Sequence, residues 1–310
     1  MTNLTKPIFR DEKAARRHLE AIRWPEGPFC PFCGTFDNVQ RLKGEDGRLH
    51  CRDCRKKFSV TVGTVFERSH IPLHKWLLAS HLMAASKKGV SAHQLHRMLG
   101  ITYKSAWFMA HRLREAMREI NPGPLGGEGK TVEADETFIG GKEKNKHVGK
   151  RNRRNIGGTG KEAVFSLVER DGKVRSHHVA SVSAKTLRPI LVAQVDRKSI
   201  LMSDDAGQYR IMGPEFAKHE VLNHSINEYV RGDAHTNTIE GYFSILKRGI
   251  TGTYHHVSQE HLKRYLGEFD FRYNNRIALK VDDEQRATKL LEGIEGKRLT
   301  YRRADKRPNV

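Results

Sequence analysis

The chain has 310 residues, with 56 Lys and Arg against 36 Asp and Glu, which gives a formal net charge of +20. The length predicts two or three domains, and the charge predicts a polyanionic partner, with nucleic acid favoured over a membrane surface because no basic amphipathic anchor stands out. The sequence has no run of about 18 apolar residues, so we expect no membrane-spanning helix, and its polar start is not typical of a signal peptide.

Helical patterns dominate the N-terminal part. Asp11 opens a predicted helix over residues 11–23, and residues 24–62 form a unit rich in Pro, Gly and Cys. Three further helices are expected at about 73–87, 91–99 and 102–120. We therefore divide this part into an N-terminal helix (1–23), a cysteine unit (24–62) and a helical region (73–120).

The four cysteines form two C-x2-C pairs, Cys30 with Cys33 and Cys51 with Cys54. Four thiolates complete a tetrahedral Zn²⁺ site with no open position, so we expect a zinc ribbon with a structural ion. The alternative is four free or disulfide-bonded cysteines, which the spacing disfavours. Confinement of all four cysteines to one short segment also fits a reducing, cytoplasmic environment.

The last two of the three helices have the outline of a helix-turn-helix. Ser91 begins a capping box, Gly100 is placed to end one helix, and Thr102 is placed to cap the next. Apolar residues at a spacing of three or four give the second helix a buried side, formed by Ala106, Met109, Leu113, Met117 and Ile120.

The other side of helix 102–120 combines aromatic and basic side chains. We expect this helix to read DNA, and take Tyr103, Lys104 and His111 as candidate contacts. Trp107 on the same side is as well suited to a core position. The alternative is a plain helical hairpin with aromatic core residues.

A segment rich in Pro and Gly, residues 121–130, is predicted to be a linker. Beyond it, strands are expected at 131–139, 162–169 and 173–180, with a hairpin turn at Asp171-Gly172, followed by a helix near 184–195 and a strand at 199–204. This order predicts a mixed α/β sheet with helices on its faces.

The connection between the first two strands is strongly basic and rich in glycine. We expect a mobile loop that is either solvated or in contact with DNA. Its basic residues are Lys142, Lys144, Lys146, Lys150, Arg151, Arg153 and Arg154.

Three carboxylates occur at positions suited to divalent metal ions: Asp135 and Asp204 on predicted strands and Glu240 at the start of a later helix. Phosphodiester cleavage is helped by two metal ions bound through carboxylates that come from separate elements. Strand alternation alone does not exclude Glu133 or Glu136 in place of Asp135.

The helix that begins near Asn237 raises a second alternative. Helix geometry alone favours Glu240 as part of a capping-box-like arrangement with Asn237 over Glu240 as a metal ligand. Further along the same helix, Lys247 and Arg248 lie one or two turns beyond Glu240, where they can bind a DNA phosphate. A last helix at 259–270 packs on the core, and residues 277–310 form a basic extension with one short helix at 284–294.

Several stretches together resemble the DDE-type insertion-sequence transposases, in the subgroup that joins a zinc ribbon to a retroviral-integrase-like domain. They run from about residue 15 to residue 276, and one departure occurs, since this chain has Asp204-Asp205 where the family usually has Asp-Glu. The matching stretches are CPFC, CRDC, GTVFERSHIPLHKWL, VEADETFIGGK, LMSDDAGQY and HTNTIEGYFSILKRGITGTYHHVSQEHLKRYLGEFDFRYNNR.

The resemblance implies a ribonuclease-H-like catalytic domain at 131–276, in which Asp135, Asp204 and Glu240 hold two Mg²⁺ or Mn²⁺ ions. It also implies that the protein binds transposon ends, nicks their 3′ ends and joins them to target DNA. We expect a homo-oligomer, a dimer on paired ends, in the nucleoid of a bacterial cell. The alternatives are a nuclease without strand transfer and a zinc-containing DNA-binding regulator.

Overall fold

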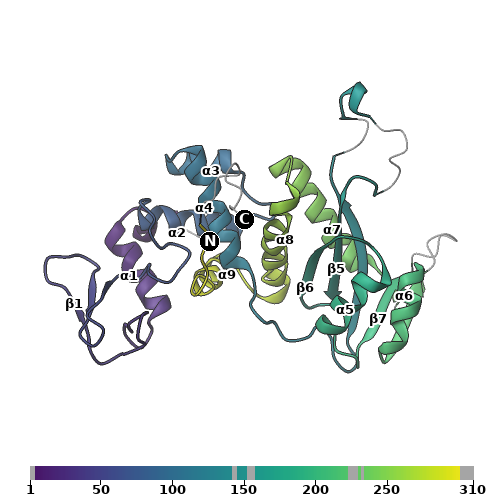
Figure 1. Ribbon diagram of the computed structural model, residues 1–310, viewed down its shortest axis with the longest axis horizontal. Helices are drawn as coiled ribbons and strands as arrows, with labels where there is room; N and C mark the ends of the chain where they lie inside the picture. Colours follow the sequence, from purple (N-terminus) through teal and green to yellow (C-terminus); the bar gives the residue numbers. More distant parts are fainter. Residues whose placement is uncertain (1–3, 142–144, 152–157, 223–229, 232–233, 301–310) are drawn as a thin grey trace, which may run out of the picture. The chain divides into compact units, whose positions relative to one another are not determined.

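The computed structural model describes residues 4–141, 145–151, 158–222, 230–231 and 234–300. The chain divides into two compact units (Figure 1). The first unit combines Met1–Ser86, Val90–Arg118 and Asp282–Val310, and the second combines Lys87–Gly89 with Glu119–Val281. Among the described residues, no helix is long and apolar enough to cross a membrane.

The first unit contains α1 (Glu12–Arg23), α2 (Leu73–Ala85), α3 (Ala92–Leu99), α4 (Tyr103–Met117) and α9 (Asp283–Glu292). Asp11 caps α1 as expected, because its carboxylate accepts the Ala14 N–H at 2.7 Å. The C-terminal helix α9 packs mainly against α2. A capping box between Asp282 and Gln285 starts α9, so the basic extension contains a folded helix of the first unit.

Helices α3 and α4 are joined by a tight turn. Gly100 ends α3 in the left-handed region at φ 58°, where a side chain would be strained. The Ser91 hydroxyl accepts the Gln94 N–H at 3.1 Å, and the Thr102 hydroxyl accepts the Ser105 N–H at 3.2 Å. The predicted boundaries on both sides of the turn are thus confirmed, with local hydrogen bonds as the cause.

The far end of α4 differs from the prediction. The helix ends at Met117, and Arg118 is extended. Ile120, predicted to lie in the buried stripe, is 67% exposed. Pro122 restricts the backbone of the residue before it, which disfavours continuation of the helix through this segment.

The cysteine unit contains a small antiparallel sheet of β1 (Val39–Arg41), β2 (Leu49–Cys51) and β3 (Lys57–Phe58). Trp24 packs edge-on against both Phe29 and Phe58, and Phe58 is fully buried. These aromatic rings give the unit a small apolar centre beside the cysteines.

The second unit is built on a five-stranded sheet with the order β6-β5-β4-β7-β8. Its first three strands are antiparallel neighbours, whereas β7 runs parallel to both β4 and β8. The bounds are β4 (Thr131–Ile139), β5 (Glu162–Glu169), β6 (Val174–Val179), β7 (Ile200–Asp204) and β8 (Lys218–Leu222). The predicted mixed sheet is confirmed, and β8 is an additional edge strand.

Helices cover both faces of this sheet (Figure 1). On one face lie α5 (Ala184–Gln194) and α6 (Gly207–Met212), which pack on Val132, Ala134 and Leu201. On the other lie α7 (Asn237–Gly249) and α8 (Gln259–Asn274). A π-helical turn, Ile250–Tyr254, extends the C-terminal end of α7. The two-residue strands β9 (Val230–Arg231) and β10 (Ala234–His235) pair with each other just before the start of α7.

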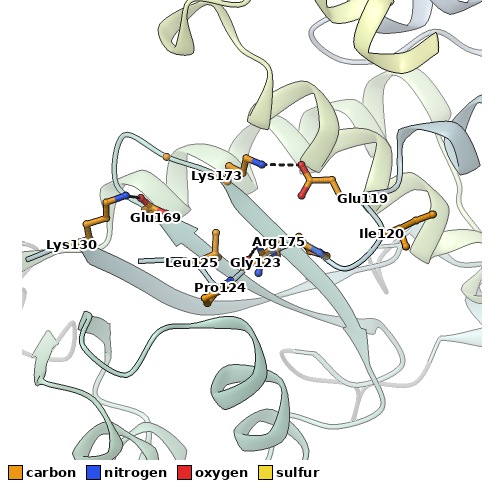
Figure 2. A pocket seen from close by; sticks show the side chains of 11 residues that line it. Glu119, Ile120, Gly123, Pro124, Leu125, Lys130, Glu169, Lys173 and Arg175 are labelled. Carbon is orange, nitrogen blue, oxygen red and sulfur yellow. Dashed lines mark hydrogen bonds and ion pairs between the residues drawn. The ribbon is translucent and has the colours of Figure 1, made fainter. Parts of the chain in front are cut away.

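The segment predicted as a linker is fixed to the second unit. Leu125 is 1% exposed, its N–H donates to the Gln194 carbonyl at 2.8 Å, and its carbonyl accepts the Asp196 N–H at 2.9 Å. Figure 2 shows the cleft of about 590 Å³ beside this segment. The basic side chains that line the cleft have partners, since Lys130 pairs with Glu169, Lys173 pairs with Glu119 and Arg175 bonds to the Gly123 carbonyl.

Part of the basic loop lies outside the described residues. Lys142, Lys144, Arg153 and Arg154 belong to that part, so their predicted role is not addressed by the structure. Of the described members, Lys146 and Arg151 are exposed, and the Arg151 side chain donates to the Lys146 carbonyl at 2.8 Å.

Candidate active site and metal centre

The four cysteines meet at one point of the first unit. Their sulfur atoms all lie within 4.8 Å of one another, with 3.5 Å between Cys30 and Cys54 and 3.6 Å between Cys33 and Cys51. A disulfide needs about 2.05 Å, so none is formed. Four sulfurs placed about 2.3 Å from a tetrahedral ion are about 3.8 Å apart, so this donor set fits zinc.

Backbone turns hold the two cysteine pairs in place. The Cys30 N–H donates to the Thr35 carbonyl at 2.9 Å, and the Cys51 N–H donates to the Lys56 carbonyl at 3.0 Å. Burial raises the pKa of the Cys30 thiol, but bonds from backbone N–H groups of Phe32 and Cys33 bring it down to about 7. A thiolate is the form that binds zinc, so these N–H groups favour the ligand state.

In the second unit, Asp135 and Asp204 stand on neighbouring parallel strands. The register pairs Glu133 of β4 with Met202 of β7, and each acid follows two residues later on its own strand. Alternate residues of a strand share a face. Because Glu133 bonds to the N–H of Ile239 on α7, both acids belong to the face that α7 and α8 cover.

Glu240 lies on α7 and reaches the same face of the sheet. It is exposed, and its carboxylate accepts a hydrogen bond from the Thr236 hydroxyl at 3.3 Å. The helix begins at Asn237 with Thr236 as its N-cap, and the Thr236 side chain makes no capping bond. The alternative of a capping box centred on Asn237 is therefore not the observed arrangement.

The three acids act on one another electrostatically. Burial raises the pKa of Asp135 to about 7, although a 2.7 Å hydrogen bond from the Glu136 N–H lowers it. The negative charges of Glu136, Asp204 and Glu240 raise this pKa further. A carboxyl group that resists ionisation beside other acids, as Asp135 does, is a natural binding place for a cation.

The other acidic side chains of β4 are satisfied by fixed partners. Glu133 is fully buried and forms an ion pair with Arg170 at 2.8 Å. Glu136 points to the opposite face, where it accepts hydrogen bonds from Tyr209 and from Gln208. Burial raises the pKa of Glu136, and the Tyr209 bond lowers it. Asp135 is thus the acid of β4 that faces Asp204 and Glu240 without such partners.

The carboxylates are not drawn together as closely as the cysteine sulfurs. Within the described part of the chain, the four cysteines are the group of His, Cys, Asp or Glu ligands whose atoms all meet within 4.8 Å. Unneutralised carboxylates repel one another. A site for two ions about 3.5–4 Å apart also spreads its ligands more widely than a site for one.

Basic residues follow Glu240 along the exposed side of α7. Ser244, Lys247 and Arg248 are all exposed, and they follow the acid by four, seven and eight residues, which places them on the same side of the helix. The Arg248 guanidinium donates to the Ser244 carbonyl at 3.0 Å and to its hydroxyl at 2.8 Å. The helix therefore presents an acid at its start and two cations toward its end on one accessible strip.

Of the side chains on α4 that were predicted to contact DNA, only some are exposed. Tyr103 is 45% exposed and stacks on His93, and Lys104 is exposed. His111, by contrast, is 1% exposed and packs against Trp107 with ring centroids 4.2 Å apart. A side chain buried to this degree does not contact DNA in the observed structure, so we leave His111 out of the candidate DNA contacts.

Comparison with known proteins identifies both parts of the chain. Residues 10–57 match a transposase zinc-ribbon domain, and residues 124–274 match an ISXO2-like transposase domain. A protein of Halobacterium salinarum, described as an uncharacterized protein in transposable element ISH50, is 29% identical over 284 residues, covering 85% of this chain and 91% of that protein. Over both of these regions the chain is similar to insertion-sequence transposases.

One residue near these acids, Arg170, is not among the site residues predicted from the sequence. Arg170 follows β5 directly, and its guanidinium contacts Glu133, Met202 and the His235 carbonyl. In the sequence it reads as an ordinary basic residue before the Asp171-Gly172 turn. The signal that could have identified it is the buried Glu133, which lies among apolar strand residues and requires a cationic partner.

Proposed function

We propose that this transposase binds transposon ends, hydrolyses a phosphodiester bond at each 3′ end and joins the freed 3′-hydroxyl to target DNA. Asp135, Asp204 and Glu240 would hold two Mg²⁺ or Mn²⁺ ions. When bound, such ions stabilise the attacking and leaving oxygens of the reaction. The four cysteines hold a structural Zn²⁺, which takes no part in the chemistry.

The observation that carries the proposal is the convergence of the three acids on one face of the sheet. They come from β4, β7 and α7, and the charges of Asp204 and Glu240 act on Asp135. Carboxylate oxygens are the ligands that Mg²⁺ prefers, and a few of them leave room for water and phosphate oxygens.

The sheet supports the finer interpretation of the fold. Three antiparallel strands followed by two parallel strands, in the order β6-β5-β4-β7-β8 with helices on both faces, are consistent with a ribonuclease-H-like domain. In this arrangement two acids lie on adjacent central strands, β4 and β7. We propose that residues 131–276 form this catalytic domain.

Two surfaces are proposed to contact DNA. In the first unit, α3, the Gly100 turn and α4 would act as a helix-turn-helix, with Tyr103 and Lys104 exposed at the start of the reading helix. In the second unit, Lys247 and Arg248 on α7 would bind backbone phosphates near the cleaved bond. The net charge of +20 supports a polyanionic partner. We also propose that a dimer acts on paired ends.

The test is nicking and joining of labelled end DNA with Mg²⁺ or Mn²⁺ by Glu240→Gln. This change keeps the side-chain size and removes the charge. We expect loss of nearly all cleavage and strand transfer, with end binding and thermal stability retained. If Glu240 had only a structural role, Glu240→Gln would lower the free energy of unfolding by about 0.5–2 kcal/mol and leave cleavage intact. Robust cleavage by Glu240→Gln would therefore overturn the proposed site.

The same assay separates the alternatives. A nuclease without strand transfer would nick end DNA in a metal-dependent way and leave no joined product. A DNA-binding regulator would bind the DNA and show neither nicking nor joining with either metal ion. Matched controls for the acids are Asp204→Asn, which should abolish cleavage, and Asp205→Asn, which should keep substantial activity because Asp205 follows the end of β7.

A further inference from the structure

Arg170 contacts the two strands that carry Asp135 and Asp204, and it also contacts β10, the short strand that leads into α7 and Glu240. Its Nε donates to Glu133 on β4 at 2.8 Å. Its Nη2 donates to the Met202 sulfur on β7 at 2.8 Å and to the His235 carbonyl, just before α7, at 2.7 Å. Its backbone N–H also donates to the Thr131 carbonyl at the start of β4, at 3.0 Å.

Two of the residues that Arg170 contacts each precede one of the acids by two positions in the sequence. Glu133 lies two residues before Asp135, and Met202 lies two residues before Asp204. Because residues two apart on a strand share a face, Arg170 and the two acids lie on the same side of the sheet. Movement of β4 against β7 would thus break the Arg170 contacts and separate the two acids.

The third acid is tied to the same pair through the start of α7. The second carboxylate oxygen of Glu133 accepts the Ile239 N–H at 2.9 Å, and Ile239 directly precedes Glu240. The first N–H groups of a helix have no partner within the helix, and a carboxylate there is favourable. The N-cap residue Thr236 makes no side-chain capping bond, so Glu133 supplies this partner from β4.

The burial of the pair argues against a simple stabilising role. Glu133 is fully buried, and the Arg170 side chain is 20% exposed. A buried ion pair often stabilises a protein no better than apolar residues of similar size, because its desolvation cost is high. Removal of either partner is costly, however, because it leaves the charge of the other partner uncompensated.

We propose that Arg170 and Glu133 are positioning residues that set the spacing of Asp135, Asp204 and Glu240 and thereby the affinity of the active site for its divalent ions. The inference rests on the proposed function, because it takes these three acids as the metal ligands. Neither Arg170 nor Glu133 is proposed to touch metal or DNA.

The experiment measures Mn²⁺ binding by the zinc-loaded full-length protein, from the electron paramagnetic resonance signal of free Mn²⁺. We expect Arg170→Gln to raise the Mn²⁺ concentration for half-saturation about 10- to 100-fold, which is the usual effect of losing a group that orients metal ligands. Arg170→Lys keeps the charge but cannot reach all three partners, so its shift should be smaller. Cleavage of end DNA should recover at high Mn²⁺, with end-binding affinity unchanged.

The matched control is Arg272→Gln in the same unit. Arg272 forms a buried ion pair with Glu268 within α8, away from β4 and β7. Its loss should lower thermal stability and leave Mn²⁺ half-saturation as in the wild type. An unchanged Mn²⁺ midpoint in Arg170→Lys, or an equal shift in Arg272→Gln, would overturn the positioning role.

Asp135→Asn distinguishes this inference from the proposed function. If Asp135→Asn binds Mn²⁺ as the wild type does, the proposed metal site itself is wrong. If Asp135→Asn abolishes Mn²⁺ binding while both Arg170 variants bind normally, the metal site stands and the positioning role fails.

Discussion

The carboxyl group of Asp270 on α8 joins β6 and α7 in a buried hydrogen-bond network. It accepts the Ser176 hydroxyl and the Ser176 N–H, each at 2.8 Å, and the Tyr242 hydroxyl at 2.6 Å. Burial raises the pKa of Asp270 from 3.8 to about 6, although these three bonds lower it, and the charge of Glu119 raises it further. The folded protein therefore keeps a proton that the unfolded chain releases at lower pH.

We expect Asp270→Asn to remove a pH-dependent part of the free energy of unfolding. Between pH 3.8 and about 6 the native state binds the extra proton, so wild-type stability falls as pH rises through this window and levels off above it. The difference between these pKa values corresponds to about 3 kcal/mol. Relative to Asp270→Asn, the wild type should thus lose about 2 kcal/mol between pH 4 and pH 7, because the unfolded chain is already more than half ionised at pH 4.

The measurement is urea unfolding of both proteins at several pH values, followed by circular dichroism. Comparing the two proteins at each pH cancels other titrating groups and any constant cost of the amide. The three tryptophans, Trp24, Trp76 and Trp107, all lie in the first unit, so their fluorescence provides an internal control. A stability difference that stays constant from pH 4 to pH 7 would refute the raised pKa and the reasoning built on it.

Three further outcomes are expected. Metal analysis of the purified protein should find about one zinc per chain. Cys51→Ser should release this zinc and locally unfold residues 24–62, which limited proteolysis would detect. A wild-type protein that is fully folded without zinc would contradict this prediction. Lys104→Ala should weaken binding to cognate ends by about 1–3 kcal/mol if the side chain contacts a base, whereas a phosphate contact would weaken binding to all sequences and flatten its salt dependence. Unchanged affinity on cognate and unrelated DNA at matched salt would remove the start of α4 from the DNA contacts.

The central strands could be predicted closely from the sequence because their signals are local. The predicted ranges 131–139 and 162–169 coincide with β4 and β5, whose apolar runs end at glycine or charged turn residues. The edge strand β8 was missed. It buries only Leu222 fully and has Lys218 at its exposed end, so it lacks both a long apolar run and a clear alternation.

Helix α4 shows what periodicity does not determine. The 3.6-residue pattern predicted which side of α4 is buried. It did not predict how much of the rest of the helix surface is covered by other helices. The helix contacts α2, α3 and α9, and its buried residues include His111, Arg112 and Arg114, which the pattern assigned to no core position. The partners that bury them are distant in the chain, so local periodicity could not show that His111 is buried.

The choice among the acids of β4 was also beyond local sequence. Alternation left Glu133, Asp135 and Glu136 open, and the family resemblance favoured Asp135. The structure adds partners that no local pattern reveals. Glu133 is paired by Arg170, 37 residues away, and Glu136 is bonded by Tyr209, 73 residues away.

These partners bear on why the proposed site needs a cation. Arg170 compensates the charge of Glu133, and two hydrogen-bond donors on α6 satisfy Glu136. For Asp135, the structure supplies burial, one backbone N–H and the repulsion of neighbouring acids, and its pKa rises to about 7. A buried carboxylate in this state gains more from a bound divalent ion than either neighbour does. We therefore expect the proposed metal site to use Asp135, because Glu133 and Glu136 already have partners within the fold.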